Sequence, residues 1–130
     1  MHLLKGCLLS SVFCLLSSCH QADDVEVAAQ SAKVYYDYLL QGQYDDYVAG
    51  LHQPDSIPAG YRSQLVANAK MFMQQQRREH RGIKAVRVSH ATADAAARTA
   101  EVFLVLEYGD GGAEQVLVPM VREGSVWYLR

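Results

Sequence analysis

The sequence predicts an α+β fold, in which N-terminal helices pack on a curved four-stranded antiparallel sheet. Apolar residues recur with the helical period of about 3.6 as far as Gly82 and with the strand period of about 2 beyond it. The segments after Gly82 are separated by turns too short for a crossover helix, so consecutive strands must run antiparallel. A chain of 130 residues, 50% of them hydrophobic, has the length and the apolar surface of one domain.

Three helices are expected in the first part of the chain. Apolar residues at i, i+3, i+4 and i+7 predict a first helix over 25–40, which Gly42 ends. A shorter second helix is expected over 44–51, after which two prolines interrupt the pattern. A third helix is predicted over 58–81, with Gly82 as its stop. Its apolar stripe, expected in the core, consists of Tyr61, Leu65, Ala69, Phe72 and Met73.

Four strands are expected at 83–91, 99–108, 114–122 and 126–130, joined by hairpin turns. Alternation along the second strand separates two faces. The uniformly apolar face, expected to contact the helices, carries Val102, Leu104, Leu106 and Tyr108. The opposite face carries Glu101, Phe103, Val105 and Glu107, so both acidic side chains are expected to lie outside any pocket.

Residues 1–18 have the proportions of a signal peptide: one early lysine and an apolar run over 6–16. The run is shorter than the about 20 residues that a membrane-spanning helix needs. Leu16-Ser17-Ser18-Cys19 resembles the bacterial lipobox, in which small residues precede a cysteine that a lipid-transfer enzyme alkylates. The alternative is a buried cysteine in an N-terminal helix.

Lipidation of Cys19 would divide the chain into a signal peptide (1–18), a lipidated cysteine with a short tether (19–24) and a domain (25–130). Cys7 and Cys14 would leave with the signal peptide, so no disulfide or thiolate site is expected in the mature domain. Two or three acyl chains, palmitate among them, anchor a protein to a membrane without spanning it.

The residues after Cys19 bear on which membrane holds the anchor. His20 is not the aspartate that marks inner-membrane retention in enteric bacteria, which favours the outer membrane. Asp23-Asp24 resembles the acidic export signal of surface lipoproteins in Bacteroidetes. The alternative is a solvated tether whose acids complement a helix dipole, so the domain is expected either in the periplasm or at the cell surface.

Two stretches of the chain resemble a known superfamily. Residues 35–43 (YYDYLLQGQ), followed by 44–47 (YDDY), resemble a helix–glycine–aromatic–acidic join, and residues 123–129 (EGSVWYL) resemble a closing strand with a tryptophan after a glycine. Both are features of the NTF2-like (cystatin-like) superfamily, especially of its small lipoproteins of the DUF4878-like kind. The resemblance implies a cone-shaped domain over 25–130. Enzymes of the superfamily carry an acid or a histidine inside the cone, and no residue here matches that position.

His90 is the one candidate for acid–base catalysis. Val86, Val88 and His90 alternate together along the first strand, so His90 is expected at the mouth of the pocket. The alternative is a surface or hydrogen-bonded histidine at a strand end, because the sequence places no second histidine or acid to orient it.

Tyr35 and Tyr38 are the expected ligand contacts, because they lie three positions apart and off the core stripe of the first helix. Aromatic rings with a polar tip suit sugars, peptides and planar ligands. The alternative is that the helix tyrosines pack in the core with their hydroxyls at its rim, as Tyr36 and Tyr61 are expected to do.

The outer face of the sheet is a candidate interface for a homodimer or an envelope protein partner. The residues expected to project from it are Phe103, Val105, Leu117 and Val121. Pairing through this face is also what the superfamily resemblance implies.

Other classes of function are disfavoured. A net charge of −2 lacks the positive field of a nucleic-acid binder. No HExxH, CxxC or EF-hand spacing occurs, so no metal or other cofactor is expected. The glycine-rich 109–112 joins two strands, whereas a phosphate loop precedes a helix.

The expected function is that of a membrane-anchored lipoprotein acting as a non-catalytic ligand-binding or protein-interaction module of the bacterial cell envelope. The sequence does not identify a small-molecule ligand. One alternative is a small enzyme of the isomerase or dehydratase type, using His90 and a tyrosine in the cone. Another is a structural subunit of an envelope complex, with a filled cone.

Overall fold

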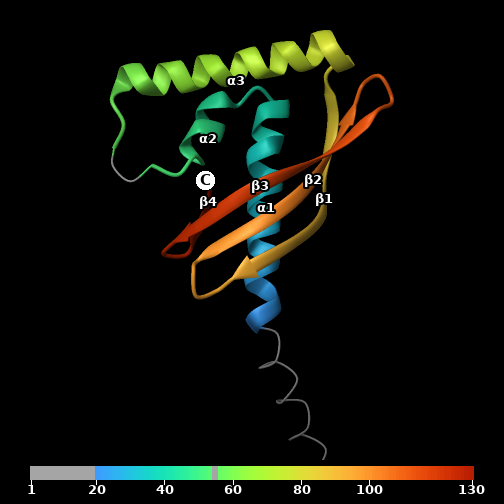
Figure 1. Cartoon of the computed structure of the whole chain (residues 1–130). Coiled ribbons are helices and arrows are strands. Elements are labelled where there is room, and N and C mark those ends of the chain that lie inside the picture. Colours follow the sequence, from blue (N-terminus) through green and yellow to red (C-terminus); the bar gives the residue numbers. More distant parts are fainter. Residues whose placement is uncertain (1–19, 54–55) are drawn as a thin grey trace, which may run out of the picture.

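The computed structural model describes residues 20–53 and 56–130. The predicted signal peptide and Cys19 lie outside the described residues. In the described part, three helices precede four strands, as the sequence predicts (Figure 1). The elements are α1 (His20–Leu40), α2 (Tyr44–Ala49), α3 (Ala59–His80), β1 (Ile83–Asp94), β2 (Thr99–Tyr108), β3 (Ala113–Glu123) and β4 (Val126–Leu129).

The helices end where the sequence places glycines. Gly42, after α1, has a φ of 75°, and the Gln43 N–H donates to the Tyr38 carbonyl at 2.8 Å. Arg81 and Gly82, after α3, have φ values of 60° and 86°, so the backbone leaves the helix through two left-handed residues. Both predicted stops are confirmed. At its other end α1 begins at His20, earlier than the expected position 25.

The strands form one antiparallel meander in the order β1-β2-β3-β4. The bounds of β2 are those predicted, and its inward face is buried as expected, with Leu104 among the most deeply buried side chains. β1 runs on to Asp94, beyond its predicted end at 91. The core cluster between the sheet and α1 includes Ala28, Ala29, Ala32, Val86, Val102, Leu104, Leu106, Val118, Met120, Trp127 and Leu129.

α1 lies along the concave face of the sheet, behind the diagonal strands in Figure 1. The three alanines on its buried face, Ala28, Ala29 and Ala32, have side chains small enough to let the helix approach the strands closely. Large side chains from the sheet then fill the space beneath the helix. The interior of the cone is therefore a packed apolar core.

α3 departs from the expectation for its apolar stripe. It runs across the end of α1 (Figure 1) and buries only Ala69, Met73 and Gln76. Tyr61 and Phe72, expected in the core, are exposed. The reason is geometric: α3 contacts α2, the end of α1 and the start of β1, so only a narrow side of it is covered.

The segment after α2 extends the sheet beyond β4. Leu51 forms a parallel bridge with Leu129. The His52 N–H donates to the Leu129 carbonyl at 2.7 Å, and the Leu129 N–H donates to the Gly50 carbonyl at 2.8 Å. Consequently α2 ends at Ala49 rather than at the predicted 51, because the next residues pair with the strand.

Candidate functional site

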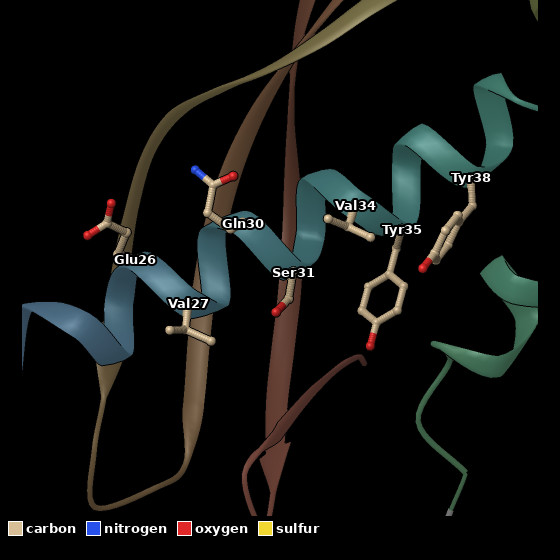
Figure 2. A pocket seen from close by; sticks show the side chains of 7 residues that line it. All are labelled: Glu26, Val27, Gln30, Ser31, Val34, Tyr35 and Tyr38. Atoms are coloured by element: carbon tan, nitrogen blue, oxygen red, sulfur yellow. The ribbon is translucent and has the colours of Figure 1, made fainter.

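A groove of about 640 Å³ runs along the face of α1 that points away from the sheet (Figure 2). We call it the α1 groove. Glu26 and Gln30 project on one side of the helix, and Val27, Ser31 and Tyr35 project on the other. Its full lining is Glu26, Val27, Gln30, Ser31, Val34, Tyr35 and Tyr38. Because these residues recur at steps of three and four, they form one continuous helical stripe.

The α1 groove holds apolar side chains that the domain itself does not bury. Val27 is 48% exposed and Val34 is 43% exposed, although the opposite face of the same helix is fully buried. Single exposed apolar residues are ordinary, but two valines next to two tyrosines form a contiguous patch. Such a patch is typical of a surface that contacts a protein, a membrane or a ligand.

The two predicted contact residues, Tyr35 and Tyr38, both line the α1 groove. Their ring centroids are 6.3 Å apart, and the rings are inclined at 56°. The Tyr35 hydroxyl donates to the Trp127 carbonyl at 2.7 Å, and its ring lies against Gly50. Burial, followed by the neighbouring Tyr128 and Tyr38, raises the pKa of Tyr35. The hydrogen bond and the contact with Gly50 therefore hold the Tyr35 ring in one position at the side of the groove.

The expected placement of His90 is wrong. A bulge interrupts the register between Val88 and His90, so Val88 pairs with Leu104, whereas His90 pairs with Phe103. Paired residues share a face, and Phe103 and Leu104 lie on opposite faces of β2. His90 is thus on the outer face, exposed, with its ring stacked on Phe103 at a centroid distance of 4.2 Å.

Among the described residues, the buried part of the inner face carries no carboxylate or imidazole, and its one ionisable side chain is Tyr108, whose hydroxyl donates to Glu114 at 2.6 Å. The one buried amide side chain among the described residues is that of Gln76, in α3. An isomerase or dehydratase needs a proton-transferring group beside its substrate. On the described inner face, Tyr108 is the one buried side chain that could serve in this way.

The outer face of the sheet is less open than predicted. Phe103 and Leu117 pair directly across the strands, and Leu117 is 49% exposed. Val105 is only 8% exposed. The Ser89 hydroxyl donates to the Gln115 side chain at 3.2 Å, and this bond crosses β2 above Val105. Of the four predicted interface residues, Phe103 and Val121 are half-buried, so Leu117 alone projects freely.

Sequence reasoning did not predict the contact between His52 and Glu123. His52 Nε2 lies 3.5 Å from Glu123 Oε1, at the edge of β4. The two residues are far apart in the chain and come together only through the bridge between Leu51 and Leu129. The local sequence pattern around Leu51 does not indicate that this residue pairs with Leu129.

Within residues 20–53 and 56–130, no group of three metal-binding side chains comes together. No helix in the same ranges is long and apolar enough to cross a membrane.

Comparison with known proteins identifies the fold. No protein-family model and no curated protein matches the chain in sequence. Among solved structures, the chain resembles a Campylobacter jejuni protein described as a presumed NTF2-like transpeptidase, with a TM-score of 0.60 and 11% sequence identity. The match covers 75% of this chain and 92% of the other. The helices followed by a curved antiparallel meander are an NTF2-like fold, as the sequence resemblance implied.

Proposed function

We propose that this chain is a lipoprotein of the bacterial cell envelope, anchored at Cys19, whose NTF2-like domain binds a protein partner through the α1 groove. The observation that carries the proposal is the stripe of exposed Val27 and Val34 beside half-buried Tyr38, on a helix whose other face is buried. The role is binding rather than catalysis, because apolar and aromatic side chains dominate this stripe.

The chemistry of the α1 groove favours a protein over the membrane surface. A helix that lies on a membrane carries lysines and arginines beside its apolar face. Here the side chains near the stripe include Glu26 and Asp37, and Lys33 is paired with Asp37 at 2.7 Å. A tyrosine pair with an adjacent apolar strip is typical of protein interfaces.

The predicted anchor would place this groove close to the lipid. α1 begins at His20, the residue after Cys19, and the groove begins at Glu26. A partner would therefore be held near the membrane, which we propose to be the outer membrane. The Campylobacter protein, at 11% sequence identity, supports the fold of this domain alone.

The anchor is tested by replacing the cysteine. Cys19→Ser should abolish incorporation of labelled palmitate and move the protein from the membrane fraction to the soluble fraction. Cys14→Ser is the matched control and should change neither. If the Cys19→Ser protein keeps its label, the lipobox assignment is wrong. Protease treatment of intact cells then separates surface display from a periplasmic location.

The groove is tested by photo-crosslinking in living cells of the native host. A photoreactive phenylalanine at Val34 should yield one discrete adduct, identified by mass spectrometry, that Val27→Asp removes. The same probe at Leu117, on the outer face of the sheet, is the control and should yield none. An adduct that forms only at Leu117, or one that survives Val27→Asp, would contradict binding in the α1 groove.

A further inference from the structure

A second pocket lies at the edge of β4, where residues 50–52 pair with that strand. Its volume is about 380 Å³, within the range of small-ligand sites. We infer that this β4-edge pocket binds a short zwitterionic peptide, with the peptide carboxylate at Arg62 and its ammonium group at Glu123. The pocket is lined by Val48, Ala49, Leu51, His52, Gln53, Ser56, Ile57, Arg62, Glu123 and Tyr128.

The apolar part of the pocket is built by the segment that joins β4. Leu51 bridges to Leu129, and this backbone pairing fixes the segment beside Tyr128. Val48 is fully buried beneath, and Ile57 lines the pocket from the other side of the connection to α3. These side chains give the pocket an apolar floor that suits an aliphatic side chain.

A cation lines the pocket from α3. Arg62 donates one hydrogen bond, to the Asp45 carbonyl at a marginal 3.4 Å. No carboxylate among the residues that the structure describes forms an ion pair with it. A guanidinium has five N–H donors in a planar fork that matches a carboxylate, so most of its binding capacity remains for a ligand.

An anion lines the pocket from the end of β3. Glu123 is 60% exposed on its side chain and contacts His52 Nε2 at 3.5 Å. The backbone N–H of His52 is bonded to the Leu129 carbonyl, which fixes the main chain of this residue at the edge of β4. The second carboxylate oxygen of Glu123 can accept a hydrogen bond from a ligand ammonium group.

Together these groups select a class of ligand. A simple organic anion would be attracted by Arg62 but repelled by Glu123. A simple cation would be attracted by Glu123 but repelled by Arg62. A ligand with both charges and an apolar body satisfies all three parts of the pocket. Because the cation and the anion come from different elements, a short peptide suits the site better than a single ion does.

The test is calorimetric titration of the full chain, purified in detergent, with Leu-Leu, N-acetyl-Leu-Leu and Leu-Leu amide. The uncapped dipeptide should bind most tightly. Each cap should weaken binding by about fivefold, the effect of one partly exposed ion pair. Arg62→Gln should remove the penalty of the amide cap only, and Glu123→Gln should remove the penalty of the acetyl cap only.

Matched controls separate this inference from general charge effects and from the α1 groove. Arg78→Gln and Glu101→Gln make the same changes of charge elsewhere and should leave all three affinities unchanged. Val34→Asp, which alters the α1 groove, should leave them unchanged too. Absence of Leu-Leu binding, equal affinity for the three peptides, or cap penalties that persist in both pocket variants would overturn the inference. Thermal unfolding of each variant verifies that it is folded.

Discussion

The hydroxyl of Tyr35 donates a hydrogen bond to the backbone carbonyl of Trp127, at 2.7 Å and across 92 positions of the chain. Tyr35 lines the α1 groove, and Trp127 is buried in the short edge strand β4. This bond therefore ties the wall of the candidate binding surface to the last strand of the sheet. A tyrosine that helical periodicity places off the core stripe thus has a structural role as well.

Tyr35→Phe should lower the free energy of unfolding by about 1 kcal/mol, the net value of one such bond. The cause is that the Trp127 carbonyl loses a partner while the aromatic packing is kept. Urea denaturation measures the change. Tyr38→Phe is the control, because the Tyr38 hydroxyl bonds to no described residue. Equal losses in the two variants would refute a special role for the Tyr35 bond.

Gly50→Ala should destabilise the domain by about 1–3 kcal/mol, as overpacking does. The backbone at Gly50 is ordinary, with a φ of −83°, so strain is not the cause. A Cβ there would instead overlap the Tyr35 ring. The double variant Gly50→Ala/Tyr35→Leu should lose less free energy of unfolding than the sum of the losses in the two single variants, because leucine removes the ring that the new Cβ would overlap. Gly60→Ala is the control and should be neutral or stabilising, because a Cβ at this helical position has open space. If the losses of stability in Gly50→Ala and Tyr35→Leu simply add in the double variant, the proposed clash is wrong.

The sequence correctly predicted the features that depend on residues close together in the chain, namely the alternation along β2 and the ends of helices. The period of β2 correctly assigned Val102 and Leu104 to the core, and Gly42 and Gly82 correctly marked helix ends. Both inferences use local geometry alone. They also suffice for the fold class, because hairpin-linked strands can only form a meander.

What the sequence could not predict depends on contacts between distant segments. A bulge before His90 inverts the face of that residue, and simple alternation assumes that no bulge occurs. Val105 is buried although it lies on the outer face, where its paired neighbours, Arg87 and Gln115, come from the two adjacent strands. The β4-edge pocket requires residues 50–52 to join β4, and nothing in their local pattern indicates that pairing.

Stability should fall between about pH 10 and about pH 12. Burial, together with the hydrogen bond from Tyr108 to Glu114 at 2.6 Å, raises the Tyr108 pKa from 10.0 to about 12. In that interval the unfolded chain has released the phenolic proton and the folded chain has kept it. Folding then binds a proton, so the free energy of unfolding decreases as pH rises.

Substitution of Tyr108 measures how much this residue contributes to the loss of stability at alkaline pH. Tyr108→Phe keeps the ring that stacks on His80 but removes the ionisable group, so denaturation at pH 9, 10 and 11 should show a shallower decline. The decline should persist in part, because burial also raises the Tyr36 pKa to about 12. Tyr61→Phe, at an exposed site, should not alter it. A decline as steep in Tyr108→Phe as in the parent would contradict the assignment.

Leu117→Glu should leave both the stability and the solution mass unchanged. Leu117 projects into solvent, and surface changes of this kind shift stability by no more than about 0.5 kcal/mol. Val105→Asp, on the same face, should unfold the domain, because it buries an unpaired charge. Light scattering and circular dichroism distinguish the two effects. Conversion of a dimer to a monomer by Leu117→Glu would show that the sheet face is an interface after all.

Gln76→Met should stabilise the domain, by about 1 kcal/mol. Gln76 is buried in α3, and its side-chain oxygen has no hydrogen-bond partner among the described residues. Leaving a buried acceptor unsatisfied costs about 1–3 kcal/mol, and methionine has a similar shape with no such group. Gln74→Met makes the same replacement at an exposed position of the helix and should have a smaller effect, set by helix propensity. Thermal unfolding decides the matter, and a lower midpoint for Gln76→Met than for Gln74→Met would mean that the amide is satisfied in solution by a bound water.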